Sequence, residues 1–406
     1  MEPVAQFNAR RSHLGMVLLT TSIILAVTVG FRQVIGLYTV PISQSLGAGL
    51  EPVSRAMALV SLLWGVASLL AGGFSDRIGA ARVILAGLLL MMVGYYLMYA
   101  AGSITVLMWS GVFIGLGVGA CGQSVLIGAV GRAAEPEQRS SAFAKLAMAN
   151  GLGQFVALPF VHLFIELLGW QGSLLVVVAS LACLLPLALM VRDAPVAQQA
   201  HRPQLLREAI SEAVRLPSYW LLTAGFFVCG FHVGFYAVHI PAFVSSLGLE
   251  SRIGVTALTL VGVANIAGTY LAGQSTKFFP QRRTLSFIYL TRSMVFLALL
   301  WLPPSPILIL TTSVILGLFW LATLPLTSGL VATFFGTGWL ALLFGFVAFS
   351  HQVGSFVGVW MAGVLFDATG SYDVMWAISL ALGLVAALLH WPIREQAVPR
   401  IAAQPG

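Results

Sequence analysis

Twelve long apolar segments constrain the fold of this chain more than any other feature of its sequence. Each has about 20 residues or more, which is enough for a helix to cross the hydrocarbon core of a bilayer. Backbone N–H and C=O groups cannot stay unpaired in lipid, so each segment must form a helix. We therefore predict an all-α membrane protein with transmembrane helices at roughly 14–42, 53–75, 82–101, 104–131, 140–165, 171–191, 218–246, 252–275, 283–301, 306–333, 340–365 and 372–392.

The composition excludes most other classes of protein. Of the 406 residues, 59% are hydrophobic and only 8% are charged, whereas about a quarter are charged in an average soluble domain. A soluble enzyme and a disordered chain are both excluded. The sequence contains no glycine-rich phosphate loop, nucleophile elbow or metal-ligand cluster, so we expect no enzymatic activity, no cofactor and no metal site. The three cysteines lie in apolar runs, and we expect no disulfide between them.

The placement of the charges predicts the topology. If the N-terminus is cytoplasmic, most of the 20 basic residues fall on the cytoplasmic side, and only Arg55 and Arg252 lie outside. This satisfies the positive-inside rule with both termini in the cytoplasm, as in a multi-pass protein of the bacterial inner membrane. The net charge of +7 is then a topology signal, and we expect no nucleic-acid partner.

The two halves of the chain resemble each other. The longest polar stretch divides the sequence into an N-terminal six-helix bundle (1–192), a cytoplasmic linker (193–217) and a C-terminal six-helix bundle (218–406). Two halves in the same orientation are parallel repeats, which place a substrate site at their interface near the bilayer midplane. The residues that recur in register include Gly30 and Gly230, Pro41 and Pro241, Gly72 and Gly273, Arg82 and Arg283, and Gly153 and Gly354.

The loop between the second and third spans carries a motif. It reads GGFSDRIGAAR from Gly72 to Arg82 and resembles the signature loop of the major facilitator superfamily. The resemblance covers essentially the whole chain and implies the major facilitator fold, alternating access and function as a monomer. It also implies a cytoplasmic gate in which Gly72 permits close helix approach and the charges form a lock at helix ends. The gate residues are Gly72, Asp76, Arg77, Gly79 and Arg82.

A narrower resemblance lies in the eleventh span and just after it. The segment from Phe344 to Tyr372 is similar to the branch that contains monocarboxylate porters and oxalate/formate antiporters, which move small carboxylates. In the oxalate/formate type a lysine in this span binds substrate, and His351 occupies the matching position. The branch also carries an arginine in the eighth span, where the nearest match here is Asn265. The span-one signature of animal monocarboxylate porters is missing, so the substrate stays open.

Ionisable residues inside the spans are candidates for function because they are costly to bury in lipid. Arg32 and Arg292 are the basic ones, and no Asp or Glu lies in the middle of a span. A cavity lined by arginine and histidine favours an anion, and the planar guanidinium can donate two parallel hydrogen bonds to a carboxylate. Our candidate substrate-binding residues are Arg32, Gln123, Asn150, His232, Tyr236, His239, Asn265, Arg292 and His351.

Each candidate also has a structural interpretation. Arg292 lies in a helix that is peripheral in this fold, where a bridge between helices is the stronger interpretation. The neutral hydrogen-bonding residues are as suited to holding helices together as to contacting substrate. His232, Tyr236 and His239 share one helix face at i, i+4 and i+7, and each histidine could either carry a proton or form a hydrogen bond in the core.

These features predict a secondary active transporter of a small, monocarboxylate-like organic anion. Proton coupling would rest on histidine or on the carboxyl group of the substrate itself. The expected partners are the anion, protons and the lipid bilayer. The alternative is a drug or metabolite exporter of the same superfamily, although the fourth span lacks the arginine typical of such exporters and the fifth lacks the glycines around Pro159. A non-transporting sensor is disfavoured because no soluble domain is apparent.

Overall fold

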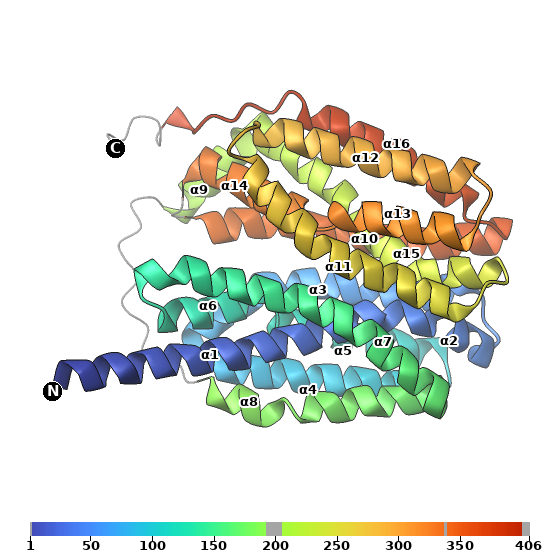
Figure 1. The fold of residues 1–406 in the computed structure, drawn as a ribbon, viewed down its shortest axis with the longest axis horizontal. Coiled ribbons are helices and arrows are strands. Elements are labelled where there is room, and N and C mark those ends of the chain that lie inside the picture. Colours follow the sequence, from blue (N-terminus) through green and yellow to red (C-terminus); the bar gives the residue numbers. More distant parts are fainter. Residues whose placement is uncertain (1, 192–204, 337–338, 400–406) are drawn as a thin grey trace. The chain divides into compact units, whose positions relative to one another are not determined.

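The computed structural model describes residues 2–191, 205–336 and 339–399 (Figure 1). Within these residues every regular element is a helix, so the predicted all-α membrane fold is confirmed. The helices follow the hydropathy of the sequence because a long apolar segment satisfies its own backbone groups only when it is helical.

Among the described residues, eleven helical stretches are long and apolar enough to cross a membrane. Each of the twelve predicted spans overlaps one of them, and the stretch Met148–Met190 contains most of two predicted spans, 140–165 and 171–191. These two are joined at Gly169, whose φ of 72° is not helical and favours glycine. The chain reverses direction within this stretch and runs back toward α8 (Figure 1).

Contacts divide the chain into two compact units, which we call unit 1 and unit 2. Unit 1 comprises Met1–Gly47 and Leu63–Gln198, and unit 2 comprises Ala48–Leu62 and Gln199–Gly406. The predicted domain boundaries, 192 and 218, stay a prediction, and residues 193–204 of the predicted linker lie outside the described part. The helix α3 is shared, since its first half packs with unit 2 and its second half with unit 1.

Most of the first nine helical elements belong to unit 1. They are α1 (Glu2–Gln33), the 3₁₀ helix η1 (Val34–Tyr38), α2 (Thr39–Leu46), α3 (Leu50–Ile78), α4 (Ala80–Tyr99), α5 (Ile104–Ala120), α6 (Gln123–Ala133), α7 (Pro136–Ala182) and α8 (Leu185–Met190). Within unit 1, α1 packs against α7, and α4 packs against α5.

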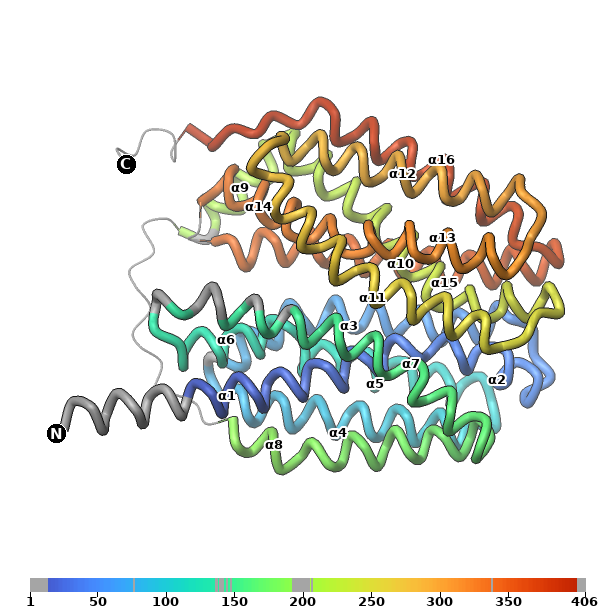
Figure 2. The backbone as a smooth tube through the Cα atoms, in the orientation of Figure 1, coloured from blue at the N-terminus to red at the C-terminus, as the bar shows by residue number. Residues whose placement is uncertain are grey.

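Unit 2 contains the remaining helices. They are α9 (Leu206–Arg215), α10 (Pro217–Ser246), α11 (Ser251–Ser275), α12 (Gln281–Trp301), α13 (Pro306–Leu318), α14 (Thr323–Phe335), α15 (Leu340–Thr369) and α16 (Asp373–His390). Here α10 packs against α15, α11 against α13, and α12 against α16, which run side by side in the tube view (Figure 2).

Repeated glycines have the same role in both units. A Cβ added to Gly30 would lie 2.7 Å from the carbonyl oxygen of Gly153, and one added to Gly230 would overlap the carbonyl of His351. The partner glycines behave alike, because a Cβ on Gly153 would overlap α1 and one on Gly354 would overlap α10. Glycine lets the two backbones touch at these crossings, which explains why these residues recur in the sequence.

The fourth and tenth spans are each broken in the middle. In unit 1 the break at Cys121–Gly122 separates α5 from α6, and in unit 2 the break at residues 319–322 separates α13 from α14. The first span is interrupted as well, where α1 gives way to η1. Irregular backbone at membrane depth is tolerated only where protein or a cavity satisfies it, so these breaks mark the positions where function is expected.

Candidate functional site

Arg32 lies in the last turn of α1, just before the chain tightens into η1. Its guanidinium carbon stands 5.0 Å from the centroid of the Trp64 ring, and its Nη1 lies 3.4 Å from Oε1 of Gln33. Cation–π contact holds the side chain without neutralising its charge. Since Arg32 is only partly buried, this arrangement presents a positive group at a partly accessible position in unit 1.

The backbone around Arg32 is fixed by two tyrosines. The Tyr95 hydroxyl donates to the carbonyl of Phe31 at 2.8 Å, and the Tyr38 hydroxyl shares a hydrogen bond with Ser173 at 3.0 Å. Both tyrosines are completely buried. Side chains locked in this way hold the end of α1 in place, which is what precise placement of a guanidinium requires.

The charges of the described interior favour an anion. No Asp or Glu side chain in the described residues is buried, whereas Arg292 is 1% exposed and Arg32 is partly buried. A cation site inside a membrane would need a carboxylate to offset the desolvation of the ion. The described interior is therefore suited to a negatively charged ligand.

Gln123 and Asn150 lie on the other inner helices of unit 1. Gln123 is the first residue of α6, directly after the break in the fourth span, and is half-buried. Asn150 lies in α7, where its Oδ1 accepts a hydrogen bond from Nε2 of Gln154 at 3.1 Å. Both α6 and α7 pack against α1, the helix that carries Arg32.

Arg292 has structural partners. From α12 it reaches the break in the tenth span and donates through Nη2 to the carbonyls of Phe319 and Trp320, the latter at 2.6 Å. Its Nη1 lies 3.2 Å from the Cys229 sulfur. The two carbonyls lie just beyond the end of α13 at Leu318, where the helix supplies no donor. Arg292 therefore satisfies orphan acceptors at the break.

Asn265 completes the same break from α11. Its Oδ1 accepts from the backbone N–H of Leu321 at 3.0 Å and from the Thr269 hydroxyl at 3.2 Å. Arg292 therefore holds the carbonyl side of the break, while Asn265 holds the N–H side. The structure thus brings the candidates Arg292 and Asn265 together at one break, where both bond to protein groups.

The three candidates on α10 are buried among helices of unit 2. The His232 Nε2 donates to the carbonyl of Ser379 at 2.9 Å, and the Tyr236 hydroxyl shares a hydrogen bond with Ser313 at 2.8 Å. In the described part of the chain Nδ1 of His232 has no hydrogen-bond partner. His232 therefore ties α10 to α16, and Tyr236 ties α10 to α13.

His239 is fixed in one tautomer. Its Nε2 lies 2.9 Å from the carbonyl of Val359, which can only accept, so Nε2 carries the proton. Its Nδ1 then accepts from the Tyr372 hydroxyl at 2.9 Å. Burial raises the pKa of the Tyr372 phenol, which keeps this donor protonated. A histidine with both nitrogens engaged in this way ties α10 to α15.

His351 differs from the other histidines because it is only half-buried. Its ring centroid stands 4.9 Å from that of Phe226, and its neighbours include the Cys229 thiol. Cys229 also contacts Arg292 and, at 3.3 Å, the Thr323 hydroxyl. His351 therefore borders the polar cluster at the break in the tenth span.

The signature loop has its expected glycine turn. Gly79 adopts a φ of 94°, which only glycine takes readily, and separates α3 from α4. The Arg82 side chain donates to the carbonyl of Ile78 at 3.2 Å, and Arg77 is exposed. The Asp76 side chain lies outside the described residues. Among the described residues, a Cβ on Gly72 would meet no atom within 4 Å, and the role of Gly72 in the gate stays a prediction.

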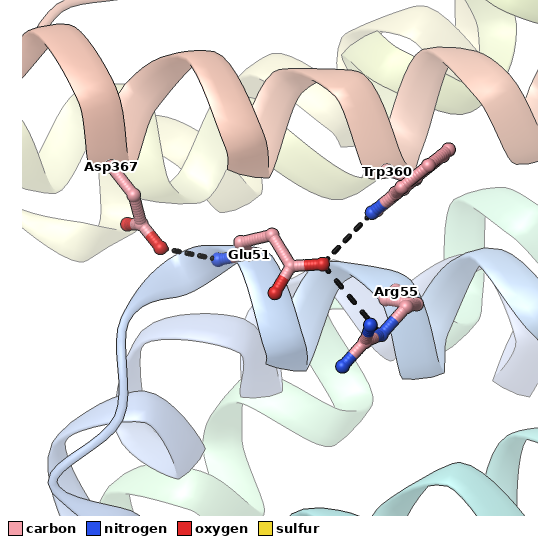
Figure 3. A network of polar contacts seen from close by, with 4 residues as sticks. All are labelled: Glu51, Arg55, Trp360 and Asp367. Atoms are coloured by element: carbon pink, nitrogen blue, oxygen red, sulfur yellow. Dashed lines mark hydrogen bonds and ion pairs between the residues drawn. The ribbon is translucent and has the colours of Figure 1, made fainter.

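A polar cluster that the sequence did not reveal ties the start of α3 to α15 (Figure 3). The Asp367 carboxylate accepts from the backbone N–H groups of Leu50 and Glu51 at 2.8 and 2.7 Å. Glu51 accepts from the Trp360 indole at 2.8 Å and pairs with Arg55 at 3.6 Å. Asp367 thus caps α3 and complements its dipole. We call this cluster the α3 clasp.

Sequence reasoning also missed two contacts that matter here. Trp64 supports Arg32, and the Ser355 hydroxyl donates to that of Ser61 at 2.9 Å, a further link between α15 and α3. The only signal for the α3 clasp was the position of two acids at helix ends, Glu51 in the first turn of α3 and Asp367 near the end of α15. A tryptophan or a serine in an apolar helix does not indicate from the sequence which residue it will contact.

Comparison with known proteins agrees with this architecture. Residues 19–359 match the family model of the Major Facilitator Superfamily. An uncharacterized MFS-type transporter of Escherichia coli K12, YhjX, is 27% identical over 246 residues, and the match covers 58% of this chain and 60% of that protein.

Solved structures show the same fold at low sequence identity. Crystal structures of a bacterial homolog of the human lysosomal transporter Spinster, inward-facing and either unoccupied or occupied, superpose with TM-scores of 0.71 and 0.72 at 14% identity. They cover 93% and 94% of this chain, and 93% and 98% of their own chains. With most of its length matched by the family model, the chain belongs to the Major Facilitator Superfamily, whose members are multi-pass membrane transporters rather than enzymes.

Proposed function

We propose that this protein is a secondary active transporter of a small, monocarboxylate-like organic anion, working by alternating access with proton coupling. Membership of the superfamily supports transport of a small molecule. The observation that carries the substrate class is Arg32, held against Trp64 in a described interior with no buried carboxylate. A guanidinium there has geometry and charge suited to a carboxylate.

The substrate-binding residues fall into two groups under this proposal. Arg32 and Gln123 contact the anion, since Arg32 offers a partly accessible charge and Gln123 begins a helix whose N-terminus carries partial positive charge. Asn150, on the neighbouring helix α7, is a third candidate ligand in unit 1. His351, half-buried beside Cys229, is the corresponding candidate ligand of unit 2.

The other candidates hold the site's framework. Arg292 and Asn265 satisfy backbone groups at the break in the tenth span, and His239 has both ring nitrogens bonded. Proton coupling then rests on His351, on His232, or on the carboxyl group of the substrate.

The proposed topology keeps both termini in the cytoplasm of a bacterial inner membrane, with the protein active as a monomer. The distribution of arginine and lysine supports it. Alternating access then opens and closes the two sides of the membrane in turn, with the signature loop at the cytoplasmic gate.

Uptake by proteoliposomes tests the proposal. Purified protein is reconstituted, a pH gradient is imposed, and saturable uptake of radiolabelled short monocarboxylates is measured. We expect uptake that depends on the gradient and is lost in Arg32→Ala but kept in Arg283→Ala, an exposed arginine at the start of α12. The absence of saturable uptake of any carboxylate, or uptake unaffected by Arg32→Ala, would contradict it, and drug resistance would then indicate an exporter.

A further inference from the structure

The helix α9 lies outside the membrane spans and is strongly amphipathic. Ala209 and Ala213, one turn apart, are buried against the protein, at 1% and 2% exposure. Ile210 and Val214, also one turn apart, are exposed at 37% and 55%. An apolar edge left open on a helix beside a membrane span is typical of helices that lie in the membrane interface.

The position of α9 is fixed relative to the membrane span that follows. Only Leu216 separates its end at Arg215 from the start of α10 at Pro217, which begins the span Pro217–Ser246. The Trp220 indole donates to the carbonyl of Val214 at 2.9 Å, which caps the end of α9 and fixes the angle between the helices. Tryptophan is enriched at this level of a bilayer.

A groove with a volume of about 540 Å³ opens between the two helices. Its apolar residues on α10 stand at i, i+4 and i+7, so they form one stripe that runs about 10 Å along the helix at 1.5 Å per residue. Arg215 lies at the end of the groove where the span begins, and Trp220 is 52% exposed beside it. The lining residues are Val214, Arg215, Pro217, Trp220, Leu221 and Ala224.

This arrangement has the shape and chemistry of a lipid. The apolar stripe runs into the span, where an acyl chain lies, and the guanidinium stands at the surface, where a phosphate lies. Arg207, also exposed on α9, adds positive charge on the same helix. The acids of α9 do not line the groove, and Glu208 is engaged by the N–H of Leu205 at 3.0 Å. Arginine beside a leaflet attracts anionic phospholipid.

We propose that the groove between α9 and α10 binds an acidic phospholipid from the leaflet that α9 faces. The phosphate accepts hydrogen bonds from Arg215, and one acyl chain lies along Pro217, Leu221 and Ala224. The bound lipid covers the open edge of α9 and holds it against the first turn of α10. This inference does not depend on the identity of the transported substrate.

The experiment compares lipids with identical acyl chains on the full chain purified in non-ionic detergent. Native mass spectrometry counts bound lipid, and melting temperature reports stabilisation by mass action. We expect phosphatidylglycerol to be retained and to raise the melting temperature, and phosphatidylcholine to do neither. Arg215→Gln should reduce phosphatidylglycerol retention at least fivefold, Arg215→Lys should restore part of it, and Arg283→Gln should match the wild type.

Several outcomes would overturn the proposal. Equal retention of the two lipids would show a site without charge recognition. Unchanged retention in Arg215→Gln, with the variant melting like the wild type, would place the lipid elsewhere. An equal rise in melting temperature with inorganic phosphate would indicate a site for free anions, and a loss of dimers in Arg215→Gln would indicate a contact between copies. Failure of carboxylate uptake would leave the lipid result unaffected.

Discussion

The breaks in the fourth and tenth spans occupy equivalent places in the two repeats, yet they are held together differently. In unit 2 a buried arginine and an asparagine satisfy the backbone groups that the break leaves without partners inside the helix. In unit 1 the described bonds at the break are local, from Cys121 N–H to Gly117 and from Gly122 N–H to Gly119, with the Cys121 thiol reaching Ile84.

The sequence register explains this difference. The register that pairs Gly72 with Gly273 also pairs Trp64 with Asn265, and it pairs Met91 with Arg292. Met91 has no N–H to donate to a carbonyl as Arg292 does, and Trp64 has no oxygen to accept from an N–H as Asn265 does. Trp64 instead supports Arg32. The comparison teaches that a buried arginine satisfies the framework in one repeat, while the arginine of the other lies partly exposed against an aromatic ring.

Arg292→Met should give the largest effect on stability. The substitution leaves the carbonyls of Phe319 and Trp320 without their donor, and each unsatisfied buried group costs about 1–3 kcal/mol. We expect the free energy of unfolding of the purified protein to fall by about 3 kcal/mol or more, measured by denaturant titration. The control is Arg283→Met, which removes an exposed arginine of the same helix. Normal stability combined with lost transport would instead make Arg292 a substrate ligand.

Arg32→Lys should affect transport more than stability. Lysine keeps the charge but loses the planar fork that grips a carboxylate. We expect uptake at low substrate concentration to fall about tenfold, which corresponds to about 1.4 kcal/mol, while the melting temperature changes little. Arg283→Lys, at an exposed position near the start of α12, serves as the matched control. A variant that unfolds easily yet transports normally would reverse the roles assigned to the two arginines.

Asn265→Leu and Trp64→Leu test the paired positions directly. The first leaves the N–H of Leu321 unsatisfied and should cost about 1–2 kcal/mol of stability. The second removes the ring beneath Arg32 and should cost about 1 kcal/mol or less, with a larger loss of uptake. Thermal unfolding and proteoliposome uptake are measured on both variants. Equal losses of uptake and of stability in the two variants would remove the contrast between the repeats.

Asp367→Asn should give the smallest effect, at the α3 clasp. The amide oxygen can replace one of the two acceptors, but the charge that complements the dipole of α3 is lost, which costs about 0.3–1 kcal/mol. We expect faster hydrogen exchange at the N–H groups of Leu50 and Glu51, measured by mass spectrometry. Asp373→Asn, at the start of α16, is the control because it contacts neither group. Unchanged exchange at α3 would mean that the clasp does not hold this helix end.

The fold could be predicted almost completely, because it depends on local properties of the chain. Hydropathy located the spans, and the recurring Gly30 and Gly230 lie where the structure brings two helix backbones together. Gly72 shows the limit, because no described atom lies within 4 Å of a Cβ added there. A glycine in an apolar helix signals close approach only if another helix crosses there, and the sequence does not say which helices cross.

The candidate site could be predicted only in its residue types. Sequence identified Arg292, Asn265 and His239 as unusual, because polar groups in a span are costly. It could not show that their partners are backbone groups of α13 and α15. It gave no sign of Trp64 or of the lipid groove beside α9, since neither departs from ordinary composition.

The sequence by itself determined the helical class, the spans, the repeat and the family, because lipid forces helicity on any long apolar segment and the signature loop is contiguous. Only the tertiary structure decided which polar side chains satisfy backbone groups of the framework and how far each is buried. The partners of a polar side chain depend on which helices meet at a broken span, and these partners differ between the two repeats although the repeats are similar in sequence. A buried charge acquires its role from its partners, and those partners are distant in the chain.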